Sequence, residues 1–134
     1  MRFMLLVIPK AYEDAAPDLM PDPEGIDRMM EFNKEMADAG IILAMDGLHP
    51  PAAGARLSFS GGKATVTDGP FAEVKEFLGG YWVIQVKDRD EALAWASRAP
   101  MDDGDIIEVR RVMEAEEFGE EHAEKWKDLN VPGR

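Results

Sequence analysis

The 134-residue sequence contains no cysteine, which excludes disulfide staples and thiolate chemistry. It also has no apolar run near the roughly 18 residues that a membrane helix needs. The short apolar start at residues 3–8 is better explained by a strand than by a signal peptide, because no small-residue cleavage site follows it. We therefore expect a cytoplasmic protein without a membrane segment.

Positive charge is also scarce, with 15 lysines and arginines against 27 acidic residues and a net charge of -12. Phosphate backbones and anionic membrane surfaces repel such a chain, so neither nucleic acid nor membrane is an expected partner. The acidity chiefly favours solubility. A basic partner protein is the alternative.

Metal-binding and nucleotide-binding motifs are missing. The chain has two histidines and no HExxH, CxxC or phosphate-loop motif, and no elbow motif surrounds its serines. We predict no metal site and no cofactor.

The segments that are present predict an α+β domain over residues 1–113, followed by an acidic C-terminal helix or arm over 114–134. Glycines 61 and 62 are typical of a two-residue hairpin turn. Aspartates cap both expected helices, at Asp22 and Asp88. The expected strands are 3–8, 41–45, 55–60, 63–67, 81–87 and 105–112, and the expected helices lie between 22 and 40 and between 88 and 100.

This order matches a ferredoxin-like βαβ-βαβ fold with an inserted β-hairpin. Both helices are expected on one face of an antiparallel sheet, which leaves an apolar face that a homodimer would bury. The residues expected to pack are Ile26, Met29, Met30, Asn33, Met36 and Ala37 in the first helix, and Ala92, Trp95, Ala96 and Ala99 in the second.

The most informative segment of the chain is 68–84, DGPFAEVKEFLGGYWVI, which combines a turn, charged residues and a double glycine with an apolar strand. Asp68 begins a Gly-Pro turn. Glu73, Lys75 and Glu76 form either an ion-pair cluster or the rim of a pocket. The double glycine that follows them permits close approach of backbone or ligand.

His49 is the best candidate acid or base, with Asp46 or Asp68 orienting it. The alternative is a loop histidine that hydrogen-bonds to backbone. Strand alternation places a second polar set on the open sheet face, where it would line a dimer cleft. This set consists of Tyr81, Gln85, Glu108 and Arg110.

Within that set, Glu108 and Arg110 have two possible roles. They either line the wall of a pocket or form an ion pair with each other. Arg110 or Lys75 would hold an anionic group of a ligand.

The segment 68–84 resembles the signature of the DGPF, or DGPFAETKE, proteins of the YCII-related superfamily, with Val74 in place of threonine. The resemblance implies a ferredoxin-like fold that dimerises into an α+β barrel, with a biochemical role that is mostly undefined. Some YCII-related enzymes, including a dehydrochlorinase, use a His–Asp pair whose histidine belongs to the first helix. The first helix here has no histidine, so only His49 could substitute, from another place.

Two functions follow as predictions. The first is a homodimer that binds a small organic or anionic ligand in its cleft, with metal-free lyase, isomerase or hydrolase chemistry. The second is a non-catalytic regulator that binds a partner such as an extracytoplasmic-function sigma factor, which DGPF proteins often accompany.

Overall fold

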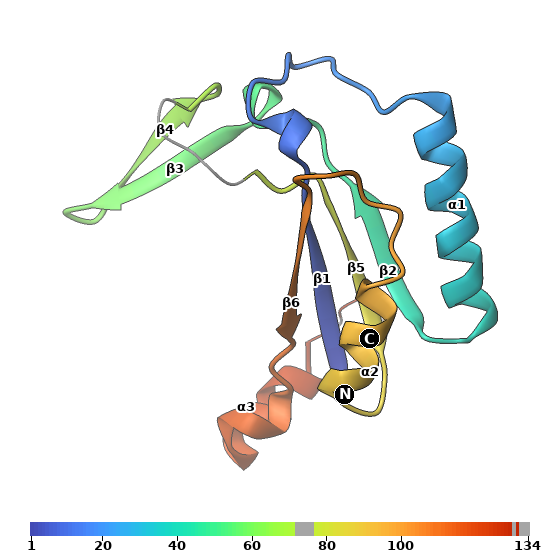
Figure 1. Ribbon diagram of the computed structural model, residues 1–134. Helices are drawn as coiled ribbons and strands as arrows, with labels where there is room; N and C mark the ends of the chain where they lie inside the picture. The colour runs from blue at the N-terminus through green and yellow to red at the C-terminus, as the bar shows by residue number, and fades with distance from the viewer. Residues whose placement is uncertain (72–76, 130, 132–134) are drawn as a thin grey trace.

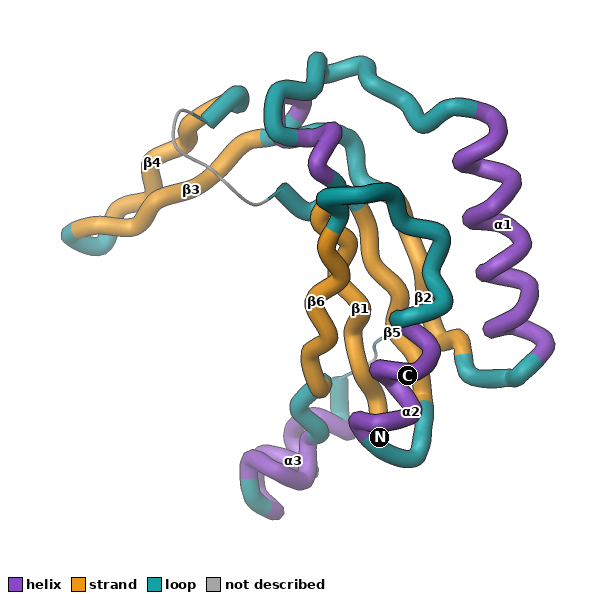
Figure 2. The backbone as a smooth tube through the Cα atoms, viewed as in Figure 1, coloured by secondary structure: helices purple, strands orange, loops and turns teal. Residues whose placement is uncertain are grey.

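A computed structural model describes residues 1–71, 77–129 and 131 (Figures 1 and 2). Its main sheet has four antiparallel strands in the order β2-β5-β1-β6. These are β1 (Arg2–Ile8), β2 (Ile42–Gly47), β5 (Gly80–Gln85) and β6 (Ile106–Arg111). The hairpin β3 (Ala55–Ser60) and β4 (Lys63–Asp68) forms a separate two-stranded sheet, and the helices are α1 (Pro23–Asp38), α2 (Arg89–Ala96) and α3 (Glu120–Lys127). The predicted ferredoxin-like fold is confirmed.

The first two helices begin where the sequence predicts. The Asp22 carboxylate accepts a hydrogen bond from the Gly25 amide at 2.6 Å, and Pro23 occupies the first helical position. At α2 the Asp88 carboxylate accepts from the Glu91 amide at 2.9 Å. Each cap satisfies an amide that has no partner within its helix.

Both α1 and α2 cover one face of the sheet, and the core lies between them and the strands (Figure 1). The predicted inward face of β5 is confirmed, because Trp82, Ile84 and Val86 are buried. The Trp82 indole packs edge-on against the Phe32 ring with centroids 5.3 Å apart.

The packing stripe predicted for α1 is partly wrong. Phe32 and Met36 are buried, whereas Ile26 and Met30 are exposed, Met30 by 56%. The positions facing the sheet are 29, 32, 33 and 36, which follow the i, i+3, i+4, i+7 spacing. Met30 directly follows Met29 and is therefore rotated about 100° away from this stripe.

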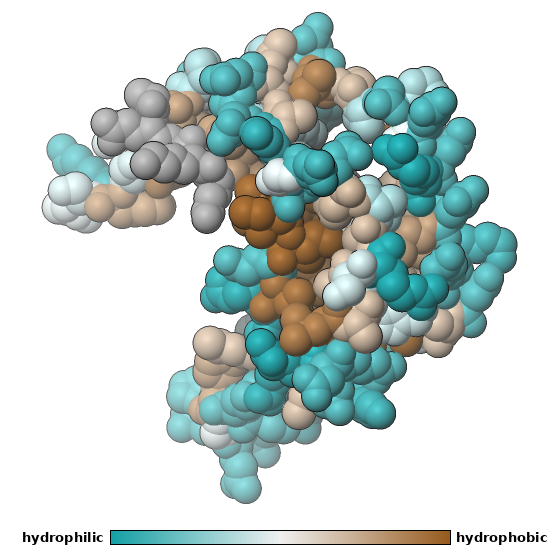
Figure 3. All heavy atoms as spheres, in the orientation of Figure 1, coloured by the Kyte–Doolittle hydropathy of each residue, from teal (hydrophilic) through white to brown (hydrophobic). Residues whose placement is uncertain are grey.

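The opposite face of the sheet is open. Its apolar residues are Met4, Leu6, Ile8, Val83 and Ile106, and all of them are partly or fully exposed. Strand register aligns Asp46, Tyr81, Leu6 and Glu108 in one row across this face. The hairpin and α3 both lie on the side of the sheet away from α1, at opposite ends of the strands (Figure 1), and Figure 3 shows an apolar patch over β6 and β1 between them.

One irregularity in β2 shapes this face. A β-bulge between Ile42 and Ala44 shifts the pairing with β5 by one residue. Ile42 packs against the core, while Ala44 lies opposite Val83 on the open side. After the bulge, Met45 pairs with Trp82 and Asp46 pairs with Tyr81.

The acidic C-terminal arm is fixed to the end of the sheet. The Arg2 guanidinium donates two hydrogen bonds to the Glu114 carboxylate, at 2.9 and 2.8 Å. Arg111 and Glu117 form a second ion pair at 3.1 Å. The paired geometry at Glu114 gives the arm a defined direction.

Candidate functional site

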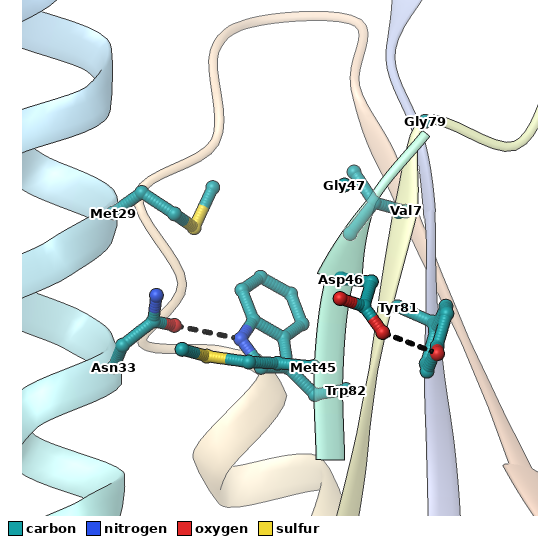
Figure 4. Close-up of a pocket in the computed structure, with 10 residues that line it drawn as sticks. Val7, Met29, Asn33, Met45, Asp46, Gly47, Gly79, Tyr81 and Trp82 are labelled. Atoms are coloured by element: carbon teal, nitrogen blue, oxygen red, sulfur yellow. Dashed lines mark hydrogen bonds between the residues drawn. The ribbon is translucent and has the colours of Figure 1, made fainter. Parts of the chain in front are cut away.

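A cavity of about 330 Å³ lies between α1 and the strands β2 and β5. Figure 4 shows Met29 and Asn33 of α1 pointing toward Met45 and Trp82 of the sheet. The complete lining consists of Val7, Met29, Asn33, Met45, Asp46, Gly47, Gly79, Gly80, Tyr81 and Trp82. The side chains between helix and sheet are mostly apolar, with one amide among them.

That amide belongs to Asn33. Its Oδ1 accepts a hydrogen bond from the Trp82 indole Nε1 at 2.7 Å, which fixes both side chains. Its Nδ2 makes only a long contact with the Met30 sulfur, at 3.8 Å, among the described residues. The amide therefore retains donor capacity for a ligand acceptor. Asn33 was predicted to pack within the α1 stripe, although a single polar residue in an apolar stripe was an available signal of a binding site.

Asp46 and Tyr81 form a hydrogen-bonded pair on the face of the strands that is turned away from α1 (Figure 4). The Tyr81 hydroxyl donates a 2.7 Å hydrogen bond to the Asp46 carboxylate, and Figure 4 shows both side chains pointing away from α1. This hydrogen bond, with smaller effects of desolvation and of the Asp46 charge, raises the pKa of the Tyr81 phenol. The phenol is thus a hydrogen-bond donor at neutral pH. Both residues belong to the predicted set, and the structure brings them together.

Replacing Asp46 by asparagine is expected to lower the pKa of Tyr81 toward its ordinary value. Because the fold raises this pKa, the interaction stabilises the protein below the unfolded-state pKa and is lost as pH rises through the folded-state pKa. Tyr12→Phe is the appropriate background, since burial raises the pKa of Tyr12 too and the chain has only two tyrosines. Tyrosinate absorbance during an alkaline titration measures the change. An unchanged titration after Asp46→Asn would contradict the pairing.

The remaining open-face residues do not converge on this pair. Glu108 and Arg110 form an exposed ion pair at 3.4 Å, as the alternative interpretation predicted. Glu108 lies two strands from Tyr81, roughly 10 Å away by ordinary strand spacing. Gln85 is exposed at the far end of β5, opposite Arg2. This set therefore occupies one face, as predicted, without forming one cluster.

His49 lies on an exposed loop after β2. Within the part of the chain that the structure describes, it makes no hydrogen bond or ion pair with Asp46 or Asp68. Asp68 ends β4 opposite Ala55. The acid–base role of His49 and Asp68 stays a prediction. Glu73, Lys75 and Glu76 lie outside the described residues.

The glycines of the segment 68–84 allow the close approaches that were predicted. A Cβ on Gly80 would lie 2.8 Å from the Asp46 carbonyl oxygen, and one on Gly79 would lie 2.5 Å from the Pro9 ring. A backbone hydrogen bond also holds this part of the chain, because the Gly79 amide donates to the Val7 carbonyl at 2.8 Å. The absence of side chains here keeps β2, β5 and the chain after β1 in contact beside the cavity.

Within residues 1–71, 77–129 and 131, no three histidine or acidic side chains cluster as metal ligands. None of the helices in those ranges has the length and apolar character required to cross a bilayer.

The fold and these sites belong to a small α+β protein of the ferredoxin-like type, and comparison with known proteins gives its family. The model of the YCII-related domain matches residues 1–116, so the chain belongs to the YCII-related family. An uncharacterized protein of Rhizobium meliloti (strain 1021) is similar, with 41% identity over 63 residues. That match covers 47% of this chain and 51% of the relative, so the chain spans about half the length of the curated protein it matches.

Proposed function

We propose that this YCII-related protein is a homodimer that binds a small, mainly apolar organic molecule in the cavity beneath α1. The observation that carries the proposal is the Asn33 amide, held by Trp82 among the mainly apolar side chains between α1 and the sheet. Ligand sites are typically built this way, from apolar walls with a few fixed polar groups. The volume of about 330 Å³ suits a compact, ring-sized molecule.

The lining also indicates the charge of the ligand. No lysine or arginine lines this cavity within the described part of the chain, and the Asp46 side chain points to the opposite face. An uncharged molecule whose acceptor oxygen meets the Asn33 amide therefore fits best. An anionic ligand would instead need Arg110 on the open face, which its ion pair with Glu108 makes less available.

Any catalysis would use the acids and bases that the chain offers near this end of the sheet. The Asp46 carboxylate, which the Tyr81 hydroxyl holds in place, is suited to accept a proton, and His49 is suited to proton transfer. Metal-free lyase, isomerase or hydrolase chemistry is the class that such groups support.

The dimer part of the proposal follows from the open sheet face. Packing two such faces together would bury apolar side chains that a single chain leaves partly exposed, and would form an α+β barrel. Membership of the DGPF group, which segment 68–84 resembles, is part of the same proposal.

A thermal-shift screen of neutral aromatic molecules tests the cavity. A ligand at 100 times its Kd is expected to add about 2.7 kcal/mol to the free energy of unfolding. Asn33→Leu should abolish this stabilisation, while Ile26→Leu, an exposed change on the same helix that does not line the cavity, should preserve it. A panel without any stabilising molecule, or equal responses of both variants, would count against the site.

The second candidate is the regulator that binds a protein partner such as a sigma factor. The net charge of -12 supports it, since an acidic surface attracts a basic partner at long range. This function would not require the cavity, so binding that persists in Asn33→Leu would favour it.

A further inference from the structure

The β3–β4 hairpin has one apolar face that nothing in the described chain covers. Leu57 pairs with Val66, and Phe59 pairs with Ala64, so these side chains share one face. Leu57 is 56% exposed, Val66 61% and Phe59 78%. The opposite face carries serine, threonine and Arg56, whose guanidinium lies 4.2 Å from the Phe71 ring centroid.

This hairpin also lacks support from the main sheet. Within the described residues it forms its own two-stranded sheet and pairs with none of the other strands. A two-stranded hairpin is at best marginally stable in water unless its apolar face packs against something. The projecting position of the hairpin therefore indicates a contact with another molecule (Figure 1).

The C-terminal arm presents a second exposed apolar surface. It lies on and beside α3 and is lined by Phe118, His122, Lys125, Trp126 and Leu129. Seven carboxylates and two lysines in residues 114–128 give the arm a net charge of -5. The hairpin, residues 55–68, contains two cations and one anion and has a net charge of +1. The two surfaces thus match in apolar character and differ in charge.

Symmetry places these surfaces against each other. The hairpin lies beyond one end of the main-sheet strands and α3 beyond the other, both on the side away from α1 (Figure 1). Two copies packed face to face are related by a two-fold axis within the interface plane. An axis across the strands brings each hairpin to the α3 end of its partner, whereas an axis along them brings two arms of charge -5 together.

We infer that, in the dimer, the apolar face of each β3–β4 hairpin docks on the α3 surface of the second copy. The inference rests on the proposed dimer and adds its geometry: a reciprocal exchange of hairpins across the open face. Burial of Leu57, Phe59 and Val66 by the partner completes a packing that the described residues of one chain do not supply. The opposite net charges of the hairpin and the arm then favour this axis over the other.

Cysteine cross-linking tests the arrangement directly, because the chain has no cysteine of its own. Ala64→Cys places a thiol on the apolar face of the hairpin and His122→Cys places one on the α3 surface, and both leave the large apolar side chains intact. Mixing the two variants with a short bismaleimide is expected to give a covalent dimer of unlike chains. Thr65→Cys, one residue along but on the other face, is the matched control and should cross-link at least about tenfold less.

The outcomes separate this inference from the proposed dimer. Light scattering that shows a monomeric wild-type protein would overturn both. A dimeric protein in which Ala64→Cys or His122→Cys cross-links only to itself would overturn the exchange and leave the dimer. A dimeric protein that forms no cross-link between unlike chains would also overturn the exchange and leave the dimer. The apolar face of the hairpin would then be a contact site for a different protein.

Discussion

Leu6→Asp is expected to convert the protein from a dimer into a monomer. Leu6 lies in the middle of the open face, between Tyr81 and Glu108 in the row across the strands. Packing two sheets together would bury the new carboxylate beside that of Glu108, and the Arg110 cation of this face is already paired with Glu108. Burying an unpaired charge costs several kcal/mol, so the Kd of the dimer should rise at least about 100-fold.

The fold of the single chain should survive this change, because the Leu6 side chain remains partly exposed on the open face of one protomer. Sedimentation velocity measures the mass, and circular dichroism checks the fold. Met30→Asp introduces the same charge on the exposed side of α1 and should leave the dimer intact. A Leu6→Asp protein of dimeric mass would show that the open face is not the interface.

Gly69→Ala is expected to lower the free energy of unfolding by about 2–3 kcal/mol. The Gly69 amide donates to the Gly54 carbonyl at 2.9 Å, which holds the end of β4 against the chain before β3. A Cβ on Gly69 would lie 2.1 Å from the Pro51 carbonyl oxygen. That oxygen belongs to the backbone, so the strain cannot be relieved by turning a side chain.

Gly54→Ala is the matched control, because its Cβ would meet the same Pro51 oxygen at an ordinary 3.5 Å. This change should alter the free energy of unfolding by no more than about 1 kcal/mol. Urea unfolding of both variants provides the comparison. Equal stabilities would show that the chain near Gly69 relaxes and that this close approach is unimportant.

Periodicity and turn chemistry predict most of the fold. The hairpin turn has Gly61 and Gly62 at φ of 57° and 77°, values that favour glycine, as its sequence indicates. The inward face of β5 follows from alternation alone. The stripe of α1 was less predictable, because Phe32 and Met30 are both apolar although they lie about 160° apart around the helix, so apolar character alone does not choose between their two sides. Only packing against Trp82 selects Phe32.

The candidate site was predicted less well than the fold. The sequence places Asp46 and Tyr81 on separate strands 35 residues apart, and their hydrogen bond depends on the register between β2 and β5. The cavity depends on the space left between α1 and the sheet, which no local pattern encodes. The sequence therefore predicts Asn33 only as a packing residue, because its hydrogen-bond partner Trp82 lies across that space and far away in the chain.

The bulge in β2 determines which side chains of this strand face the cavity, and therefore which ligands the cavity prefers. It reverses the alternation within one strand, so that Met45 faces the cavity and Asp46 faces the open side. If the same residues paired without the bulge, Asp46 would turn beneath α1 and Met45 would turn outward. A slip of one residue in pairing, without any substitution, would thus exchange a thioether for a carboxylate beside Asn33. The cavity would then select cations in place of neutral molecules.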